Sequence, residues 1–452
     1  MPKSKTQFVC QKCGVKYTKW SGKCENCGAW NSLLEQEVAE EVKFSKSISL
    51  SPEKLSGKVL AIENFANLEV STESTRYHTG FSSLDEVLGG GILPGSVILL
   101  AGQPGIGKST ILMQLCAEIS KQQPILYISG EESANQVKLR AKRLGAESEK
   151  LFFASSTSGN DIAKTILDGK FKLVIVDSIQ TLAMDELSSA PGTVSQVSSA
   201  GNAIIRAAKL TNTAVVIVGH VTKSGTLAGP KVLEHLVDVV LNFEGDRYGG
   251  FKVVRAVKNR FGSTAEAAIF EMKEFGLAEV ENPSASLLSE RQNTDGSIIL
   301  ATLEGARPLL VEIQALATKT NFGYPKRTSS GFDLNRLNLL IAVLERRTKL
   351  DLSDQDIFIN VVGGLKLQDA GADLAVCLAI ASAVAGRKLP DGYVVFGEVG
   401  LGGEVRSAFR PDQRIAEAKK LGFKTAIAPK TCKDKFITGV DDLRQTLIKY
   451  VK

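Results

Sequence analysis

A glycine-rich segment about a quarter of the way along the chain constrains the fold most. Residues 95–119 read GSVILLAGQPGIGKSTILMQLCAEI, in which an apolar, strand-like run (Val97–Ala101) precedes the pattern G-x-x-x-x-G-K-[ST] and a segment of helical period. Chance matches to this pattern occur, but here a strand lies before it and a helix after it, as a P-loop requires. The segment therefore predicts the strand–loop–helix unit of an α/β nucleotide-binding domain.

The residue types in the loop predict its ligands. Glycines allow backbone N–H groups to surround phosphates, Lys108 is expected at the β- and γ-phosphates, and Ser109 is expected to bind Mg²⁺. The predicted ligands are thus ATP or ADP with Mg²⁺. We predict nucleotide contacts at Gly102, Gln103, Pro104, Gly105, Ile106, Gly107, Lys108, Ser109 and Thr110.

Three further apolar runs predict strands that end in polar side chains. PILYISGEES ends with Glu131 and Glu132, FKLVIVDSIQ contains Asp177, and TAVVIVGHVTK contains His220. Ligands of open parallel sheets bind at the carboxyl ends of the strands. We therefore expect Asp177 to act beside Mg²⁺ and Glu131 to orient the attacking water. His220 either senses the γ-phosphate or caps a strand.

Two long segments are expected to be loops that leave the same edge of the sheet. They span residues 184–202 and 221–235 and are rich in small residues. Loops of this length in a compact domain are usually functional or disordered. Lys223 and Lys231 in the second loop either pair with DNA phosphates or are simply solvated.

The first 27 residues contain four of the seven cysteines. Cys10, Cys13, Cys24 and Cys27 form two C-x-x-C pairs separated by ten residues, each pair followed by glycine. Two such turns supply the four thiolates of a closed, structural Zn²⁺ site. The alternative, a thioredoxin-like redox pair, needs only one C-x-x-C in a strand–helix unit. Nearby lysines and aromatic residues either contact DNA or a partner, or form a solvated face: Lys12, Lys16, Lys19, Lys23, Tyr17, Trp20 and Trp30.

Composition adds weaker constraints. The 452 residues are 43% apolar and 23% charged, which is typical of folded globular domains. The sequence has no apolar run of 18 residues, and its first ten residues lack the apolar core of a signal peptide. These features predict a cytoplasmic protein without a membrane partner. The formal charge of +6 fits a polyanionic partner but does not establish one.

The stretch AVKNRFGSTAE places two cations close together after an apolar run. At strand spacing Lys258 and Arg260 point to one face, which suits binding of concentrated negative charge. The alternative is a surface strand with solvated cations. The pentapeptide comprises Lys258, Asn259, Arg260, Phe261 and Gly262.

The cysteine knuckle, GQPGIGKST, YISGEES and KNRFG, in this order and spacing, resemble the bacterial RadA/Sms family over essentially the whole chain. The resemblance implies a RecA-like ATPase that works as a hexameric ring on single-stranded and branched DNA. It also implies branch migration of recombination intermediates and a RecA-type recombinase as partner. By similarity to ring helicases, Glu131 is the catalytic glutamate, and Lys258 and Arg260 reach the γ-phosphate of the neighbouring subunit.

The C-terminal third resembles the proteolytic domain of Lon, most clearly in GEVGLGGEVR and in the apolar helix after GAD. Lon-type hydrolysis needs a serine nucleophile and a lysine base. The matching stretch at residues 371–373 has no serine, and Asp412 stands near the expected lysine, so we predict an inactive, oligomerising domain. Cys377 is expected in its core. Lys366, Arg406 and Arg414 are either DNA phosphate contacts or solvated charges.

The predicted fold class is α/β: a RecA-like P-loop core, an N-terminal zinc ribbon-type knuckle and a C-terminal α+β Lon-like domain. The expected domains are the zinc finger (1–34), a linker (35–74), the ATPase (75–275), a connector (276–295) and the Lon-like domain (296–452). The leading functional hypothesis is an ATP-driven DNA motor. The alternatives are a nucleotide-switched regulatory ATPase and an ATP-dependent protease.

Overall fold

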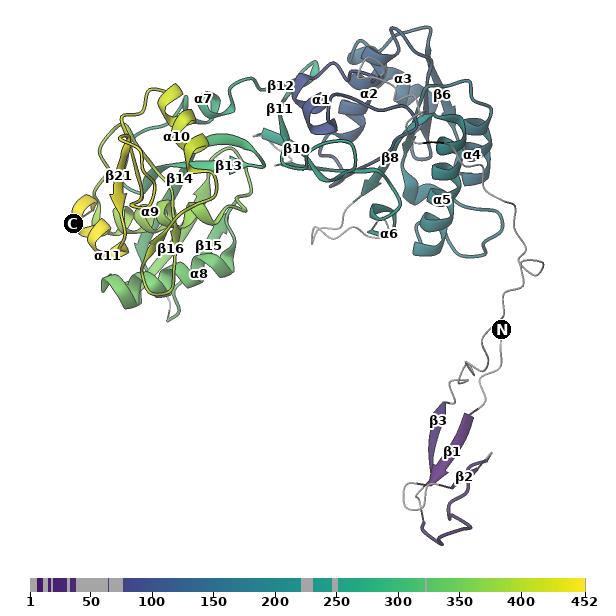
Figure 1. Ribbon diagram of the computed structural model, residues 1–452, viewed down its shortest axis with the longest axis horizontal. Helices are drawn as coiled ribbons and strands as arrows, with labels where there is room; N and C mark the ends of the chain where they lie inside the picture. Colours follow the sequence, from purple (N-terminus) through teal and green to yellow (C-terminus); the bar gives the residue numbers. More distant parts are fainter. Residues whose placement is uncertain are drawn as a thin grey trace. The chain divides into compact units, whose positions relative to one another are not determined.

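The computed structural model describes residues 6–10, 15–17, 19–30, 33–37, 64, 76–220, 231–245, 251–321 and 323–451. The chain forms two compact units, residues 1–70 and residues 71–452. The first unit carries a small sheet, and the second carries two larger sheets with their helices (Figure 1). Within the described residues, no helix is both long and apolar enough to cross a membrane.

The N-terminal unit contains a three-stranded antiparallel sheet in the order β2-β1-β3. Its strands are β1 (Thr6–Cys10), β2 (Lys16–Tyr17) and β3 (Leu33–Glu37). Strand β3 pairs with β1 along its whole length, from Thr6 opposite Glu37 to Cys10 opposite Leu33. The ribbon therefore extends three residues beyond the boundary expected at residue 34.

The ATPase sheet has nine strands in the order β12-β11-β10-β9-β4-β8-β7-β5-β6. Strands β9, β4, β8, β7, β5 and β6 are mutually parallel, as predicted, and β10 to β12 extend them as an antiparallel meander. The strands are β4 (Val97–Gly102), β5 (Ile125–Ser129), β6 (Leu151–Ser155), β7 (Leu173–Asp177), β8 (Ala214–His220), β9 (Val239–Gly245), β10 (Phe251–Asn259), β11 (Ala267–Lys273) and β12 (Gly276–Glu279).

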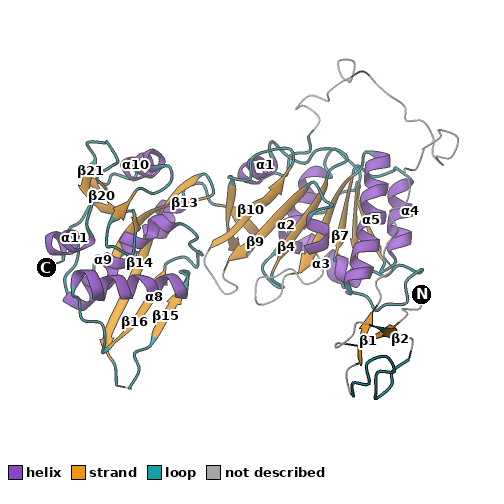
Figure 2. Ribbon diagram, turned by 60° about the horizontal axis from the view of Figure 1, so that its bottom comes forward, coloured by secondary structure: helices purple, strands orange, loops and turns teal. Residues whose placement is uncertain are grey.

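Helices cover both faces of this sheet (Figure 2). Successive residues of a strand point to opposite faces, so in β4 Ile98 and Leu100 belong to the core that includes α1, α2 and α3, and Val97 and Leu99 to the core that includes α4 and α5. The described helices are α1 (Ser82–Leu88), α2 (Lys108–Ile119), α3 (Ala134–Arg143), α4 (Gly159–Leu167), the short η4 (Ile179–Thr181), α5 (Val194–Thr211) and α6 (Lys231–Glu234).

The structure corrects two expectations about this region. The loop expected at residues 184–202 becomes helix α5 from Val194, because Val197, Ala200 and Ile204 recur at helical spacing and are buried. Strand β12 also carries the sheet to Glu279, past the boundary expected at residue 275. Of the second expected loop, residues 221–230 lie outside the described part of the chain.

The C-terminal sheet is mixed and has the order β15-β16-β14-β13-β17-β20-β21, with a separate pair β18-β19. Its long hairpin, β13 and β14, pairs in register from Ser297 opposite Gln314 to Glu304 opposite Arg307. The strands are β13 (Ser297–Glu304), β14 (Arg307–Lys319), β15 (Arg327–Ser330), β16 (Gln355–Val361), β17 (Tyr393–Val395), β18 (Glu398–Val399), β19 (Val405–Arg406), β20 (Thr425–Pro429) and β21 (Ile437–Val440).

Helix α9 (Asp373–Ala385) is the core helix of this region, since every residue from Asp373 to Ser382 is buried, Cys377 included as predicted. The same hydrophobic cluster includes Phe251 of β10 and Ile269 of β11, so it continues into the ATPase sheet. The other helical segments are α7 (Pro283–Leu288), α8 (Leu334–Val343), the π-helical turn η5 (Leu344–Thr348), η6 (Ala370–Ala372), α10 (Pro411–Lys420) and α11 (Leu443–Tyr450).

Candidate functional site: a P-loop, a cation pair and a zinc ribbon

The predicted P-loop joins the carboxyl end of β4 to the first turn of α2. Gly107 has φ of 119° and lies directly before Lys108, the first residue of the helix. Gly102 lies so close to β9 that a Cβ atom there would be 2.7 Å from the carbonyl oxygen of Phe243. The loop thus needs glycine both for its backbone angles and for its packing. The loop leads into the N-terminus of α2, where backbone N–H groups can bind anions.

Lys108 is a buried cation at the centre of this loop. Its Nζ donates to the carbonyl oxygens of Gly102 at 2.8 Å and Gln103 at 3.0 Å. Burial lowers the pKa of Lys108 to about 8, although the negative charges of Asp177 and Glu131 act in the opposite direction. A phosphate beside Nζ would compensate this buried charge, which fits the role expected from the sequence.

Ser109 and Asp177 meet as the sequence predicts. The hydroxyl of Ser109 donates to Asp177 Oδ2 at 2.9 Å, and the hydroxyl of Tyr127 on β5 donates to the same oxygen at 2.6 Å. One carboxylate beside a P-loop hydroxyl is a ligand set that suits Mg²⁺, which usually keeps several waters. Burial and the charge of Asp177 raise the pKa of Tyr127 well above its usual value, so Tyr127 stays a hydrogen-bond donor.

The two adjacent glutamates after β5 have different partners. Glu131 Oε1 accepts a 2.5 Å hydrogen bond from the hydroxyl of Ser178 and lies 3.3 Å from His220 Nε2. Glu132 instead forms an ion pair with Arg140 of α3. The two glutamates therefore differ in their partners, because the charge of Glu132 is already compensated by Arg140. A cavity of about 350 Å³ is lined by the P-loop together with Glu131, Asp177 and His220, and the ion pair of Glu132 and Arg140 lines it as well.

Tyr127 and Ser178 were missed by the sequence reasoning. Ser178 directly follows Asp177, so adjacency to a predicted ligand was an available signal. Tyr127 lies in a strand whose five residues are all buried, and its hydroxyl needs a partner there. That requirement was the signal for an acid on the neighbouring strand.

The KNRFG segment lies at the amino ends of the parallel strands, whereas the P-loop lies at their carboxyl ends. Lys258 Nζ donates to the carbonyl oxygens of Glu234 at 2.8 Å and Val237 at 2.7 Å, just after α6. Arg260 lies 3.4 Å from Asp238, whose carboxylate accepts the N–H of Val97, the first residue of β4. The P-loop begins at the other end of β4, roughly 17 Å away at about 3.3 Å per residue.

The middle of the motif fixes its turn onto α1. Asn259 Nδ2 donates to the carbonyl oxygen of Val87 at 3.0 Å, and Asn259 Oδ1 accepts the N–H of Phe261 at 2.8 Å. Gly262 lies against Gly89, because a Cβ atom at Gly262 would be 2.8 Å from Gly89 Cα. Strand β10 ends at Asn259, with an irregular register between Ala256 and Lys258. Both cations still engage one segment, residues 234–238.

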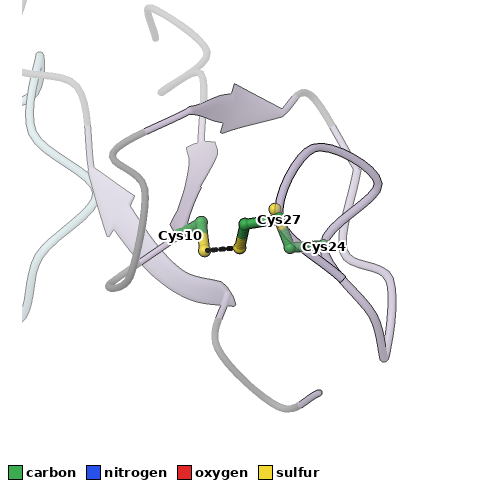
Figure 3. Close-up of side chains that lie close together, drawn as sticks. All are labelled: Cys10, Cys24 and Cys27. Atoms are coloured by element: carbon green, nitrogen blue, oxygen red, sulfur yellow. Dashed lines mark hydrogen bonds between the residues drawn. The ribbon is translucent and has the colours of Figure 1, made fainter. Parts of the chain in front are cut away.

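The N-terminal ribbon brings cysteine sulfurs together (Figure 3). The sulfurs of Cys10, Cys24 and Cys27 all lie within 4.8 Å of one another, and those of Cys10 and Cys27 are 3.7 Å apart. Cys24 accepts the N–H of Gly28 at its carbonyl at 2.8 Å, in the tight turn expected behind a C-x-x-C pair. Cys13, the fourth predicted ligand, lies outside the described residues. Three converging thiolates fit Zn²⁺.

Two family models and several curated relatives match the chain. Residues 66–226 match the model of an AAA domain, and residues 8–35 match that of a rubredoxin metal binding domain. The DNA repair protein RadA of Halalkalibacterium halodurans is 48% identical over 431 residues, which cover 95% of this chain and 93% of that protein. Those of Bacillus subtilis (47%) and Aquifex aeolicus (44%) cover 95% of this chain, and 93% and 95% of their own lengths.

The chain belongs to the RadA family of DNA repair proteins. Membership in the RadA family and the AAA domain together support an ATPase that acts in DNA repair. The match to a rubredoxin metal binding domain and the cysteine cluster support Zn²⁺ in the ribbon. The predicted α/β fold with a parallel-sheet P-loop core and a zinc ribbon is confirmed.

The predicted DNA contacts of this RadA-family chain differ in their surroundings. Lys366 is exposed, and Arg406 is exposed but paired with Glu404 at 2.5 Å. Lys223 lies outside the described residues, and Lys231 is the first residue of α6. These four positions remain predictions.

The prediction for Arg414 is wrong. Its side chain has no exposed surface and pairs with Asp369 at 2.6 Å. It also donates to the carbonyl oxygens of Ala301 at 2.7 Å and Phe409 at 3.0 Å. A guanidinium that is buried and saturated in this way cannot reach a DNA phosphate. Its charge is compensated inside the domain, as buried charges require.

In the stretch that matches the protease nucleophile, residues 371–373, the side chain of Asp373 also has partners inside the domain. Asp373 is buried at the start of α9, where it pairs with Arg336 and accepts the N–H of Val399 at 3.1 Å. Burial raises the pKa of Asp373, and Arg336 opposes that effect. Asp412 is exposed on the first turn of α10. The prediction that this domain is inactive as a protease stays a prediction.

Proposed function

We propose that this chain is a DNA-dependent ATPase that works on DNA as a ring-shaped, homo-hexameric motor. It promotes branch migration of recombination intermediates on single-stranded or branched DNA, together with a RecA-type recombinase. Family membership supports the role in DNA repair. The motor, the ring and the recombinase partner come from the resemblance described above.

The observation that carries the proposal is the separation of two phosphate-directed groups within one chain. The P-loop, Asp177 and Glu131 lie at the carboxyl ends of the parallel strands. Arg260 lies at the amino ends of these strands, so that about the length of β4 separates it from the P-loop. Its side chain is 56% exposed. Since Arg260 is too far from the P-loop of its own subunit, it is available to the γ-phosphate bound by a neighbour. This arrangement supports hydrolysis that depends on assembly.

Each polar group of the site has a role in this proposal. Lys108 binds the β- and γ-phosphates, and Ser109 and Asp177 hold Mg²⁺, which neutralises charge on the phosphate oxygens. Glu131 orients the attacking water and accepts its proton, and Ser178 and His220 hold the carboxylate in place. Arg260 and Lys258 of the neighbour stabilise the charge that develops on the transferred phosphoryl group.

DNA dependence is tested by measuring ATP hydrolysis with and without single-stranded DNA. We expect DNA to raise the rate several-fold, in the wild type and not in Lys108→Ala. Unchanged hydrolysis with bound DNA would favour the regulatory, nucleotide-switched ATPase instead. Strand exchange on a labelled forked junction then tests the motor, since a switch without motor activity leaves the junction in place even while it hydrolyses ATP.

A further inference from the structure

Asp238 is a buried carboxylate that contacts three separate elements. It stands just before β9, and its side chain is only 5% exposed. Its Oδ2 accepts the N–H of Val97 at 2.9 Å and a hydrogen bond from Lys209 Nζ at 2.5 Å. Its Oδ1 lies 3.4 Å from the guanidinium of Arg260. One side chain therefore joins the start of the P-loop strand, the last turn of α5 and the KNRFG segment.

Backbone hydrogen bonds fix the same junction. The N–H of Asp238 donates to the carbonyl oxygen of Val97 at 2.9 Å, and the N–H of Arg260 donates to that of Asp238 at 3.2 Å. Lys258 is held nearby, because its Nζ donates to the carbonyl oxygens of Glu234 and Val237. Both cations of the motif therefore contact residues 234–238, a segment that begins at Glu234, the last residue of α6.

The contact with Arg260 leaves the guanidinium able to bind a second anion. Within the described residues, Asp238 is the only carboxylate that forms an ion pair with Arg260. The distance of 3.4 Å is long for a charge-assisted hydrogen bond, and more than half of the Arg260 side chain is exposed. A guanidinium has five N–H donors. One N–H group contacts Asp238, and within the described residues the other donors have no carboxylate partner and can bind phosphate oxygens.

We propose that Asp238 is the positioning residue of Arg260, an inference that rests on the proposed action of Arg260 on a neighbour's γ-phosphate. Asp238 fixes the backbone from which Arg260 extends and orients its guanidinium by charge. Because the same carboxylate holds Val97, it connects the strand that leads to a subunit's own P-loop with the arginine that the subunit offers to its neighbour. A shift of β4 on nucleotide binding would therefore reach Arg260 through this residue.

The alternative is a purely structural role, in which Asp238 only compensates Lys209 and caps the start of β4. The two roles predict a loss of ATP hydrolysis at different active sites. A structural defect impairs the subunit that carries it, whereas a misplaced Arg260 impairs the site of the next subunit. Mixing two variant chains in one ring separates these cases.

The experiment uses full-length Asp238→Asn. The amide keeps the size of the side chain and can still accept the N–H of Val97, but it no longer attracts Arg260. We expect ATP binding close to that of the wild type and a turnover about ten- to a hundredfold lower, as misplacement of a catalytic group by about 1 Å produces. In verified mixed rings with Lys108→Ala chains, which have an intact Arg260, part of the turnover should return.

Lys209→Gln is the matched control. It removes the other cation from the same carboxylate without touching Arg260, so we expect a lower melting temperature but a turnover per folded chain close to that of the wild type. Arg260→Ala combined with Asp238→Asn should be no slower than Arg260→Ala alone, because Asp238 acts through Arg260.

The outcomes separate this inference from the proposed function. If Asp238→Asn leaves turnover unchanged, or if its lost turnover does not return in mixed rings, the positioning role is wrong. If Arg260→Ala itself hydrolyses ATP at the wild-type rate, the proposed action of Arg260 fails instead. Should Asp238→Asn not fold, Asp238→Glu keeps the charge and moves the carboxylate by one methylene, and the same loss and the same recovery are expected of it.

Discussion

At the scale of single residues, the neighbours Glu131 and Glu132 differ in the groups that contact their carboxylates. Both line the P-loop cavity. Among the residues that the structure describes, the side-chain partners of Glu131 are Ser178 and His220, and neither is a permanent cation. Glu132 is paired with Arg140. A general base needs a carboxylate that is not already held by a permanent cation. The difference in partners assigns the proposed base to Glu131.

The test of this assignment compares two matched variants. Glu131→Gln should bind ATP and lose turnover by on the order of a hundredfold or more, because the amide cannot accept the proton of water. Glu132→Gln should keep most of its turnover and lose some stability through Arg140. Binding is measured with a fluorescent nucleotide and turnover by phosphate release. A larger loss in Glu132→Gln would reverse the assignment.

Asp369 and Arg414 give a prediction about stability. Burial alone would raise the pKa of Asp369, but the hydrogen bonds and charge of Arg414 outweigh it and lower the pKa. Replacing one partner leaves the other charge buried without compensation, which typically costs about 3–5 kcal/mol. We therefore expect Asp369→Asn to lower the melting temperature markedly, as followed by circular dichroism.

The pH dependence of that pair has a definite sign. An acid with a lowered pKa stabilises the fold above its unfolded pKa of about 4 and loses this contribution as the pH falls through its folded pKa. The difference in stability between wild type and Asp369→Asn should thus be constant from about pH 5 upward and shrink in stronger acid. A difference that grows with acidification would contradict the ion pair.

At the scale of elements, the ribbon is a separate unit, so its metal site can be changed without touching the ATPase sheet. Cys27→Ala should reduce the zinc content from one ion per chain and leave the ATPase unit folded. The readouts are elemental analysis of protein kept reduced and the melting temperature of the ATPase unit. No zinc in freshly purified wild type would contradict the assignment, as would global unfolding of the variant.

How much the sequence could predict differs between elements. Strand β4 was predicted as the apolar run before the P-loop, and β5, β7 and β8 as apolar runs that end at or just before a polar functional residue. Helix α5 was in part mistaken for a loop, since three of its first six residues are serines, which fit either state. Strand β6 lacks a functional residue at its end and was not singled out.

The site was predictable to the extent that its chemistry lies in contiguous motifs. The P-loop, Asp177 and Glu131 were assigned from the sequence, and the structure brings them to one cavity. The contacts of Asp238 and the pairing of Arg414 with Asp369 were not, because they join residues 22 or more positions apart or depend on burial. An exposed and a buried arginine look alike in a sequence, which is why the prediction for Arg414 failed.

At the scale of the whole molecule, the central claim is that one subunit completes the active site of the next. Each chain carries a P-loop at the carboxyl ends of its parallel strands and Arg260 at their amino ends. A variant without Lys108 thus keeps an intact arginine, and a variant without Arg260 keeps an intact P-loop. Loss of an arginine supplied by a neighbour typically costs on the order of a thousandfold or more in rate.

The most direct test is the ATPase activity of rings assembled from Arg260→Ala and Lys108→Ala chains. Each variant alone should hydrolyse ATP on the order of a thousandfold more slowly than the wild type, while Arg260→Ala still binds ATP. In mixed rings verified by mass, interfaces that combine an intact P-loop with an intact Arg260 should restore part of the activity. Mixed rings that stay inactive, or dilute monomers that hydrolyse ATP at the full rate, would contradict the account.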